Sequence, residues 1–297
     1  MKTRSFKFII GWQLMAIICL LLINSFSVFA VELVHQQVFP LQGKHSMEVD
    51  WWLPDGTPKA LVYLQHRFMG SSENLMALGK DIAEHGFVVL MPTINVAFGN
   101  KILAQKVADT LNQQQFLLPH QLAIPDDWVL IGHSAGGLNV LFIADTLAKM
   151  GNKQLKEVIN LDGVDLNNKM SRLISNINVA NYPVNFMLSN PSMCNAHNNA
   201  VKAIKNSSFS KGRVVQLTNG SSHLDPEGND DSRMMQSLCH KPSIENTHWY
   251  HQLTLAWISE AIGEQSFPSS DDIIKQIIAS ENGKELHFEI SGTSLQK

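Results

Sequence analysis

The sequence predicts an α/β fold: a three-layer α/β/α sandwich around a mostly parallel sheet of roughly eight strands. Short apolar runs bounded by turn residues alternate along the chain with longer segments whose apolar residues recur every three or four positions. The chain has 297 residues, of which 44% are hydrophobic and 16% charged, enough to bury a large core. Such alternation is typical of parallel strands covered by helices on both faces of one sheet.

The first half of the chain supplies three of the strands. A weakly alternating segment ends in a Pro-Asp-Gly turn, and two near-continuous apolar runs follow it. Between and after those runs lie two segments with helical spacing, the first opened by serine and closed by glycine, as helix caps often are. We expect strands at 45–54, 60–66 and 87–92, and helices at 71–86 and 101–114.

The second half repeats this pattern and ends in a segment of different character. We expect strands at 128–134, 157–163, 183–191 and 213–220, a helix from 135 to about 150, and a long closing helix at 247–263. The segment between the strands at 157–163 and 183–191 is only about twenty residues long, too short for a large lid domain. Residues 267–297 form a C-terminal extension, for which we expect a helix over "IIKQII" and a strand over "ELHFEI". That strand could complete the sheet or form an accessory hairpin.

The first thirty residues are typical of a signal peptide. Three basic residues, Lys2, Arg4 and Lys7, precede an uncharged stretch, and the small-residue ending Val28-Phe29-Ala30 matches a signal-peptidase site. We expect cleavage after Ala30 and export to the periplasm or the medium. The alternative is a retained membrane anchor, because the uncharged stretch reaches the ~20 residues that can span a bilayer.

Charge and histidine spacing exclude several functions for the mature chain. Cleavage takes the 23 Lys and Arg residues to 20 against 26 Asp and Glu, a net charge of about −6. No basic cluster remains, which argues against nucleic acid as a partner. The histidines show no metal-ligand spacing, so we expect no metal and no cofactor. We expect a monomer that does not contact a membrane after signal cleavage.

Cleavage also leaves two cysteines, Cys194 and Cys239. An even pair in an exported protein predicts a disulfide. The alternative is two unpaired buried thiols.

One motif in the chain carries a specific chemistry. The strand at 128–134 runs directly into Gly132-His133-Ser134-Ala135-Gly136, and a helix follows. In this strand–turn–helix context Gly-x-Ser-x-Gly indicates a nucleophile elbow, in which Gly132 and Gly136 allow a sharp turn that exposes the serine oxygen. The alternative is an ordinary glycine-rich turn in which Ser134 caps the helix.

Four segments together resemble the α/β-hydrolase superfamily, in particular its compact secreted esterases of the chlorophyllase and polyesterase (cutinase-like) kind. They are "LQHRFMGSSENL", "GHSAGG", "INLDGVD" and "SSHLD", and the resemblance spans about residues 45–263. It implies an α/β-hydrolase domain over 31–266 without a large lid and an activity on carboxylic esters.

A serine nucleophile needs a base, and the base needs an orienting acid. In this fold the three follow the chain order Ser, acid, His. His223 lies in the loop after the last core strand, where the base is expected. For the acid we choose Asp162, which comes directly off a strand and whose spacing resembles the "LDPVD" segment of chlorophyllase-like enzymes; Asp165 is the alternative. Asp225, before Pro226, is interpreted as a turn or cap residue.

The oxyanion that develops during acyl transfer needs backbone N–H donors. We expect one from Ala135, directly after the serine, and one from Phe68, at the position that the family resemblance implies. Family members often carry glycine where this chain has Arg67, a departure that would place a positive charge at the rim of the cleft. Phe68 and Met69 could line an acyl pocket.

The sequence therefore predicts a secreted serine hydrolase that cleaves small-molecule or polymeric esters through an acyl-enzyme. A peptidase or a thioesterase on the same fold is an alternative. A catalytically inactive member that serves as a binding module is a second alternative, from a different class.

Overall fold

The computed structural model describes residues 31–288 except 44, 95–98, 167 and 229–232. The expected signal peptide, residues 1–30, therefore lies outside the described residues. From Val31 onward the described residues form one compact unit.

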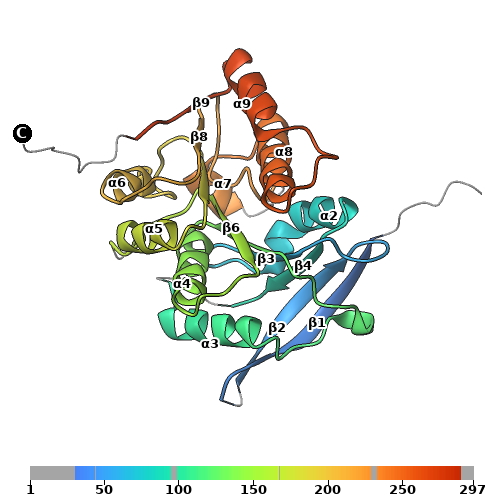
Figure 1. The fold of residues 1–297 in the computed structure, drawn as a ribbon. Coiled ribbons are helices and arrows are strands. Elements are labelled where there is room, and N and C mark those ends of the chain that lie inside the picture. The colour runs from blue at the N-terminus through green and yellow to red at the C-terminus, as the bar shows by residue number, and fades with distance from the viewer. Residues whose placement is uncertain (1–30, 44, 95–98, 167, 229–232, 289–297) are drawn as a thin grey trace, which may run out of the picture. The chain divides into compact units, whose positions relative to one another are not determined.

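A single nine-stranded sheet forms the centre of this unit (Figure 1). The strands are β1 (Glu32–Leu41), β2 (His45–Leu53), β3 (Leu61–Gln65), β4 (Val88–Pro92), β5 (Trp128–His133), β6 (Leu155–Leu161), β7 (Val184–Leu188), β8 (Val214–Leu217) and β9 (Gly283–Glu285). Their spatial order is β1-β2-β4-β3-β5-β6-β7-β8-β9. The six central strands, from β4 to β8, run parallel, whereas β1, β2 and β9 pair antiparallel at the two edges. The expected mostly parallel α/β sheet is thus confirmed.

Helices connect the strands along the chain and lie on both faces of the sheet. They are η1 (Ser72–Leu75), α2 (Met76–Glu84), α3 (Lys101–Asn112), η2 (Pro119–Gln121), α4 (Ala135–Lys149), α5 (Met170–Val179), α6 (Asn199–Lys205), α7 (Arg233–Cys239), α8 (Ile244–Ala261) and α9 (Ser270–Ala279). None of these helices in the described part of the chain is long and apolar enough to cross a membrane.

Alternate strand residues divide the core into two layers. Leu61, Tyr63 and their counterparts on the other strands pack in one cluster with helices α3 to α6. Val62, Leu64 and their counterparts pack in a second cluster with α2, α8 and α9. Because successive side chains of a strand point to opposite faces, each buried strand serves both layers and is apolar at nearly every position. This arrangement is consistent with a three-layer sandwich.

The sheet has one strand more than expected at its N-terminal edge. Strand β1 was not predicted, and its sequence explains why. Its pairing with β2 shifts register between Val34 and Gln37, and Gln36 there has φ of 49°. This bulge interrupts the two-residue alternation that identifies a half-buried strand.

The C-terminal extension packs against the rest of the unit. Helix α9 was expected within this segment, and its buried isoleucines belong to the second core cluster. Strand β9 pairs antiparallel with β8 and so completes the sheet. The strand expected over "ELHFEI" was wrong in position. Strand β9 ends at Glu285, residues 286–288 are not part of a strand, and residues 289–297 lie outside the described part.

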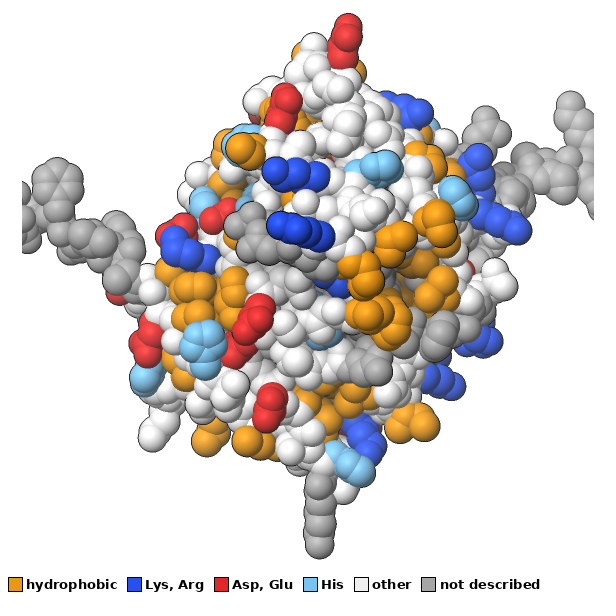
Figure 2. Space-filling view, turned by 180° about the vertical axis from the view of Figure 1, so that it is seen from behind, with side chains coloured by type: hydrophobic (Ala, Val, Ile, Leu, Met, Phe, Trp, Pro, Cys, Tyr) orange, Lys and Arg blue, Asp and Glu red, His pale blue; other side chains and the backbone are white. Residues whose placement is uncertain are grey.

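Figure 2 shows one face of the molecule, seen from behind relative to Figure 1. Acidic, basic and histidine side chains are interspersed on it, and hydrophobic side chains gather in small groups between them. The candidate functional residues lie at the carboxyl edge of the parallel strands, where the loops after β3, β5, β6, β7 and β8 meet.

Candidate active site

Ser134 stands at the junction of β5 and α4 in a conformation that few residues adopt. Its φ of 56° and ψ of −122° lie outside the regions open to most side chains. The backbone around it is fixed, since its N–H donates to the Leu161 carbonyl at 3.0 Å and its carbonyl accepts from Gly137 N–H at 3.0 Å. Its side chain makes no hydrogen bond that caps α4. The turn therefore does not use the serine as a helix cap and leaves its hydroxyl available elsewhere.

Two glycines make this turn possible by close approach. A Cβ atom on Gly132 would lie 2.3 Å from the Gly136 carbonyl oxygen, and one on Gly136 would lie 2.5 Å from the His66 carbonyl oxygen. Both distances are impossible for a side chain, so alanine at either position would push apart β5, α4 and the loop after β3. The elbow glycines predicted from the motif thus have a packing reason in the structure.

His223 lies beside the serine, from the loop that follows β8. Its Nε2 atom is 2.9 Å from Ser134 Oγ, and its Nδ1 atom is 2.6 Å from Asp162 Oδ2. The three side chains are buried, with exposed fractions of 7% or less. A hydroxyl, an imidazole and a carboxylate thus form one continuous hydrogen-bonded chain from three separate strand ends.

The carboxylate that is hydrogen-bonded to His223 is that of Asp162 and not that of Asp165. Asp162 leaves β6 with φ of 46°, which turns its carboxylate toward the loop after β8. Asp165 faces another way: its oxygens accept from the Lys169 and Met170 N–H groups at the start of α5, at 2.9 and 3.2 Å. Its carboxylate thus binds two backbone N–H groups that have no partner within that helix.

Asp162 is surrounded by hydrogen-bond donors. Ser189 donates to it twice, from its N–H to Oδ1 at 2.9 Å and from its hydroxyl to Oδ2 at 2.6 Å. The Asn195 amide donates to Oδ2 at 3.2 Å. Burial by itself raises the pKa of Asp162, but the hydrogen bond and charge of His223 and the two Ser189 donors outweigh it, so the pKa lies below its usual value. Asp162 is therefore ionised at neutral pH.

The two expected oxyanion donors come from the start of α4 and from the loop after β3, whose His66 carbonyl lies against the elbow at Gly136. Ala135 is the first residue of α4, where a backbone N–H has no partner within the helix. Phe68 lies in the loop after β3, and the preceding peptide carbonyl, of Arg67, accepts from His66 Nδ1 at 2.6 Å and from Gly70 N–H at 3.2 Å. His66 Nε2 in turn accepts from Ile94 N–H, so both ring nitrogens of His66 are used. The loop that carries Phe68 is therefore tightly held.

Arg67 is not at the rim of a cleft, which corrects the sequence-based expectation. Its side chain is only 5% exposed, and its Nε donates to Glu227 Oε1 at 2.6 Å. Glu227 is fully buried and follows His223 by four residues. The positive charge of Arg67 is thus neutralised by Glu227 inside the protein and does not face a substrate.

The predicted disulfide between Cys194 and Cys239 is present, with the two Cα atoms 5.4 Å apart. Cys194 directly precedes Asn195, one of the donors to Asp162. The carbonyl of Cys239 accepts from the hydroxyl of Ser222, the residue before His223. The bridge therefore joins the loop after β7, which supports Asp162, to the end of α7, which contacts the loop that carries His223.

Sequence reasoning missed three residues of the site: Ser189, Asn195 and Glu227. The segment "SNPSMCNAHNNA" after β7 holds no carboxylate and so offers no candidate acid. Its hydroxyl and amide groups are the donors that an acid on the neighbouring strand needs. Glu227 stood in plain view within "SSHLDPEG", but nothing in the spacing shows that it faces Arg67, which lies 160 positions earlier.

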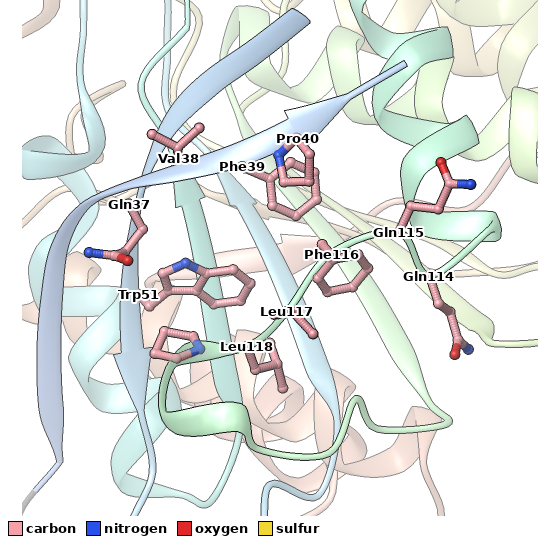
Figure 3. Close-up of a pocket in the computed structure, with 11 residues that line it drawn as sticks. Gln37, Val38, Phe39, Pro40, Trp51, Gln114, Gln115, Phe116, Leu117 and Leu118 are labelled. Carbon is pink, nitrogen blue, oxygen red and sulfur yellow. The ribbon is translucent and has the colours of Figure 1, made fainter. Parts of the chain in front are cut away.

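A separate cavity of about 590 Å³ lies at the other end of the sheet order, between β1, β2 and the segment after α3 (Figure 3). The rings of Phe39, Trp51 and Phe116 line it, the first and last with centroids 5.1 Å apart. None of the residues that line it is titratable or belongs to the hydrogen-bonded chain of Ser134. This cavity therefore offers no nucleophile or proton-transfer group.

Within the described residues, no three histidine, cysteine or carboxylate side chains are grouped as metal ligands. Comparison of the sequence with protein-family models and with curated proteins finds no match. What the chain can do chemically therefore follows from the geometry of Ser134, His223 and Asp162.

Proposed function

We propose that this protein is a serine hydrolase that cleaves carboxylic esters through an acyl-enzyme intermediate. One observation carries the proposal: the strained Ser134 turn places Oγ 2.9 Å from His223 Nε2, whose ring is held from behind by Asp162 at 2.6 Å. The mostly parallel sheet is compatible with the α/β-hydrolase fold that the motifs resemble.

In the first half of the reaction His223 acts as base. Its Nε2 takes the proton of Ser134 Oγ while that oxygen attacks the ester carbonyl carbon, and Asp162 stabilises the imidazolium that forms. The N–H groups of Ala135 and Phe68 bind the oxyanion of the tetrahedral intermediate. The C–O bond to the alcohol then breaks, and the leaving alkoxide takes the proton from His223 Nε2.

The second half repeats these steps with water. His223 takes a proton from a water molecule as its oxygen attacks the acyl carbon of the ester on Ser134. The second tetrahedral intermediate collapses, the acid is released, and Ser134 regains its proton from the imidazolium. The enzyme is restored without a cofactor or metal in any step.

Exposed apolar side chains near the site favour an ester with an apolar acyl or alcohol part. Phe68 and Met69, on the loop after β3, are 42% and 68% exposed, and Leu166 and Met193, on the loops after β6 and β7, are 46% and 75% exposed. These side chains offer apolar contacts to a small or polymeric ester. A peptidase or a thioesterase would use the same triad and oxyanion donors.

We also propose that the protein acts after export from the cytoplasm. The disulfide supports this, because such bridges persist in oxidising compartments. The N-terminal segment would serve as the export signal, with a retained anchor as the alternative.

Ester hydrolysis by the purified, oxidised protein tests the proposal. We expect p-nitrophenyl esters to be cleaved, and the Ser134→Ala variant to lose activity by roughly 10⁶-fold, as expected when a triad nucleophile is removed. An acyl series from acetate upward, a thioester and a peptide anilide separate the alternatives. Cleavage of the anilide alone would point to a peptidase. A folded protein that cleaves none of them would point to the inactive binding module.

A further inference from the structure

The carboxylate of Glu227 lies among three segments of the candidate active site. Its own loop carries His223, Arg67 reaches it from the loop after β3, and His133 reaches it from the elbow. Oε1 accepts from Arg67 Nε at 2.6 Å, and Oε2 accepts from Asn74 Nδ2 at 3.3 Å. Both charged side chains are at least 95% buried, so water does not screen this pair.

His133 extends these contacts to the backbone of the base. Its Nδ1 atom lies 3.2 Å from Glu227 Oε1, and its Nε2 atom donates to the carbonyl oxygen of His223 at 2.8 Å. Burial lowers the pKa of His133 and the nearby Glu227 carboxylate raises it; burial has the larger effect, so the pKa lies below its usual value. The carbonyl of the general base is therefore held by the residue that precedes the nucleophile.

Arg67 extends them in the other direction, to the oxyanion donor. The carbonyl of Arg67 and the N–H of Phe68 belong to one planar trans peptide unit and point in opposite directions. His66 and Gly70 hold that carbonyl, and Arg67 Nη1 donates to the Phe68 carbonyl at 3.3 Å. The guanidinium bonded to Glu227 thus also holds the peptide unit after the Phe68 Cα atom, while His66 and Gly70 hold the unit before it.

A stabilising role alone does not account for a buried pair at this place. Removing an arginine and a carboxylate from water costs about as much as their attraction returns, and an apolar pair of similar size is often as stable or more so. What an apolar pair cannot reproduce is the set of directed hydrogen bonds to the Phe68 carbonyl and to Asn74.

We propose that Arg67 and Glu227 are positioning residues, which hold the Phe68 N–H at a fixed place relative to Ser134 and His223. The inference rests on the proposed function, since an oxyanion donor matters only if Ser134 attacks a carbonyl. In this role Arg67 replaces a small residue in the oxyanion loop by a side chain that ties the loop to the base.

A double variant, Arg67→Met with Glu227→Gln, separates positioning from stability. It removes both charges together, so no unpaired charge stays buried, and we expect the melting temperature to stay within a few degrees of the wild type or to rise. We expect kcat for p-nitrophenyl acetate to fall about 10- to 100-fold, the scale of a misplaced reacting group, with KM nearly unchanged. Affinity for an alkyl boronic acid, whose adduct with Ser134 places an oxygen in the oxyanion site, should weaken by a similar factor.

The matched control is Arg213→Met with Glu285→Gln. This second arginine–glutamate pair, with Nε and Oε1 2.8 Å apart, joins β8 to β9 at the sheet edge and touches no residue of the candidate site. We expect wild-type kcat and boronic acid affinity from it. Equal losses of kcat in both double variants would overturn the positioning role.

A stable Arg67→Met/Glu227→Gln variant with wild-type kcat and boronic acid affinity would also overturn it. If that variant does not fold, Arg67→Lys serves instead, because lysine keeps the charge but lacks the planar fork that reaches Glu227 and the Phe68 carbonyl together. Folded Arg67→Lys protein should show the same fall in kcat, and wild-type kcat in it would contradict the inference. Wild-type protein without esterase activity would refute the proposed function itself, a result distinct from an active wild type with an equally active double variant.

Discussion

Two buried carboxylates close to His223, those of Asp162 and Glu227, are held by different interactions. On the acid side, Asp162 is ionised and accepts from neutral donors, the hydroxyl and N–H of Ser189 and the amide of Asn195. On the ion-pair side, Glu227 is ionised and pairs with the guanidinium of Arg67. Neutral donors leave the negative charge of Asp162 available to the imidazolium that forms during the reaction. The charge of Glu227 is instead balanced by the buried guanidinium of Arg67, and in the proposed role this pair fixes the positions of the two loops.

Asp225 is a third buried carboxylate, and its hydrogen-bond partners in the described part of the chain are backbone N–H groups instead of an imidazole or a guanidinium. It is also fully buried and lies two residues beyond His223, but its oxygens accept from the backbone N–H groups of Ser222 and Ser243. Burial outweighs these two bonds and, with the nearby charge of Asp162, raises the pKa of Asp225 to about 7. In Asp162 and Glu227 a hydrogen-bonded imidazole or guanidinium tips the balance the other way.

The largest expected effect comes from the acid side. Replacing Asp162 by asparagine should lower kcat roughly 10⁴-fold, because His223 then loses both its tautomer preference and the charge that stabilises its imidazolium. Steady-state ester hydrolysis measures this loss. The control, Asp165→Asn, should leave kcat unchanged, because Asp165 accepts from the Lys169 and Met170 N–H groups and not from His223. A larger loss of kcat in the control than in Asp162→Asn would mean that the acid is misassigned.

Loss of the bridge between the two loops should have the next largest effect. The Cys194→Ser/Cys239→Ser variant releases a loop of 45 residues, which by chain entropy lowers the free energy of unfolding by about 4 kcal/mol. Urea denaturation of the oxidised wild type and of the variant measures the difference. Below the melting transition we also expect a lower kcat, since Asn195 directly follows Cys194 and Ser222 donates to the Cys239 carbonyl. An unchanged unfolding midpoint would show that the disulfide does not stabilise the folded protein.

A smaller effect is expected from Ser189→Ala, which removes one neutral donor to Asp162. At neutral pH kcat should fall about tenfold, the scale of a hydrogen bond to a charged group. A carboxyl group whose pKa is lowered by folding keeps its stabilising effect above its unfolded-state pKa and loses it as the pH falls through its folded-state pKa. The variant raises the pKa of Asp162, so activity should be lost at higher pH than in the wild type.

The pH–rate profile of Ser192→Ala is the control for that shift. Ser192 is buried close by, and its hydroxyl makes no hydrogen bond among the residues that the structure describes. We expect its acid limb to coincide with that of the wild type. If the two alanine variants shift alike, the Ser189 hydroxyl has no particular effect on Asp162.

The sequence predicted the site residues that follow strands but not those that depend on contacts between loops. Ser134, Asp162 and His223 each follow directly from a recognisable strand, and the carboxyl ends of parallel strands meet at one edge of the sheet. Periodicity therefore places them together. Ser189 and Asn195 lie in a loop without periodicity, and Arg67 and Glu227 meet only because two loops pack against each other. Strand β1 escaped for a local reason, the bulge at Gln36.

The most direct test of the central claim is covalent labelling of the nucleophile. Folded, oxidised protein is treated with a fluorophosphonate, and peptide mass mapping locates the adduct. We predict one adduct, on Ser134, that is absent from the Ser134→Ala variant and from urea-unfolded protein, where His223 no longer activates the hydroxyl. Folded protein without an adduct on Ser134, or with the adduct on another serine, would contradict it.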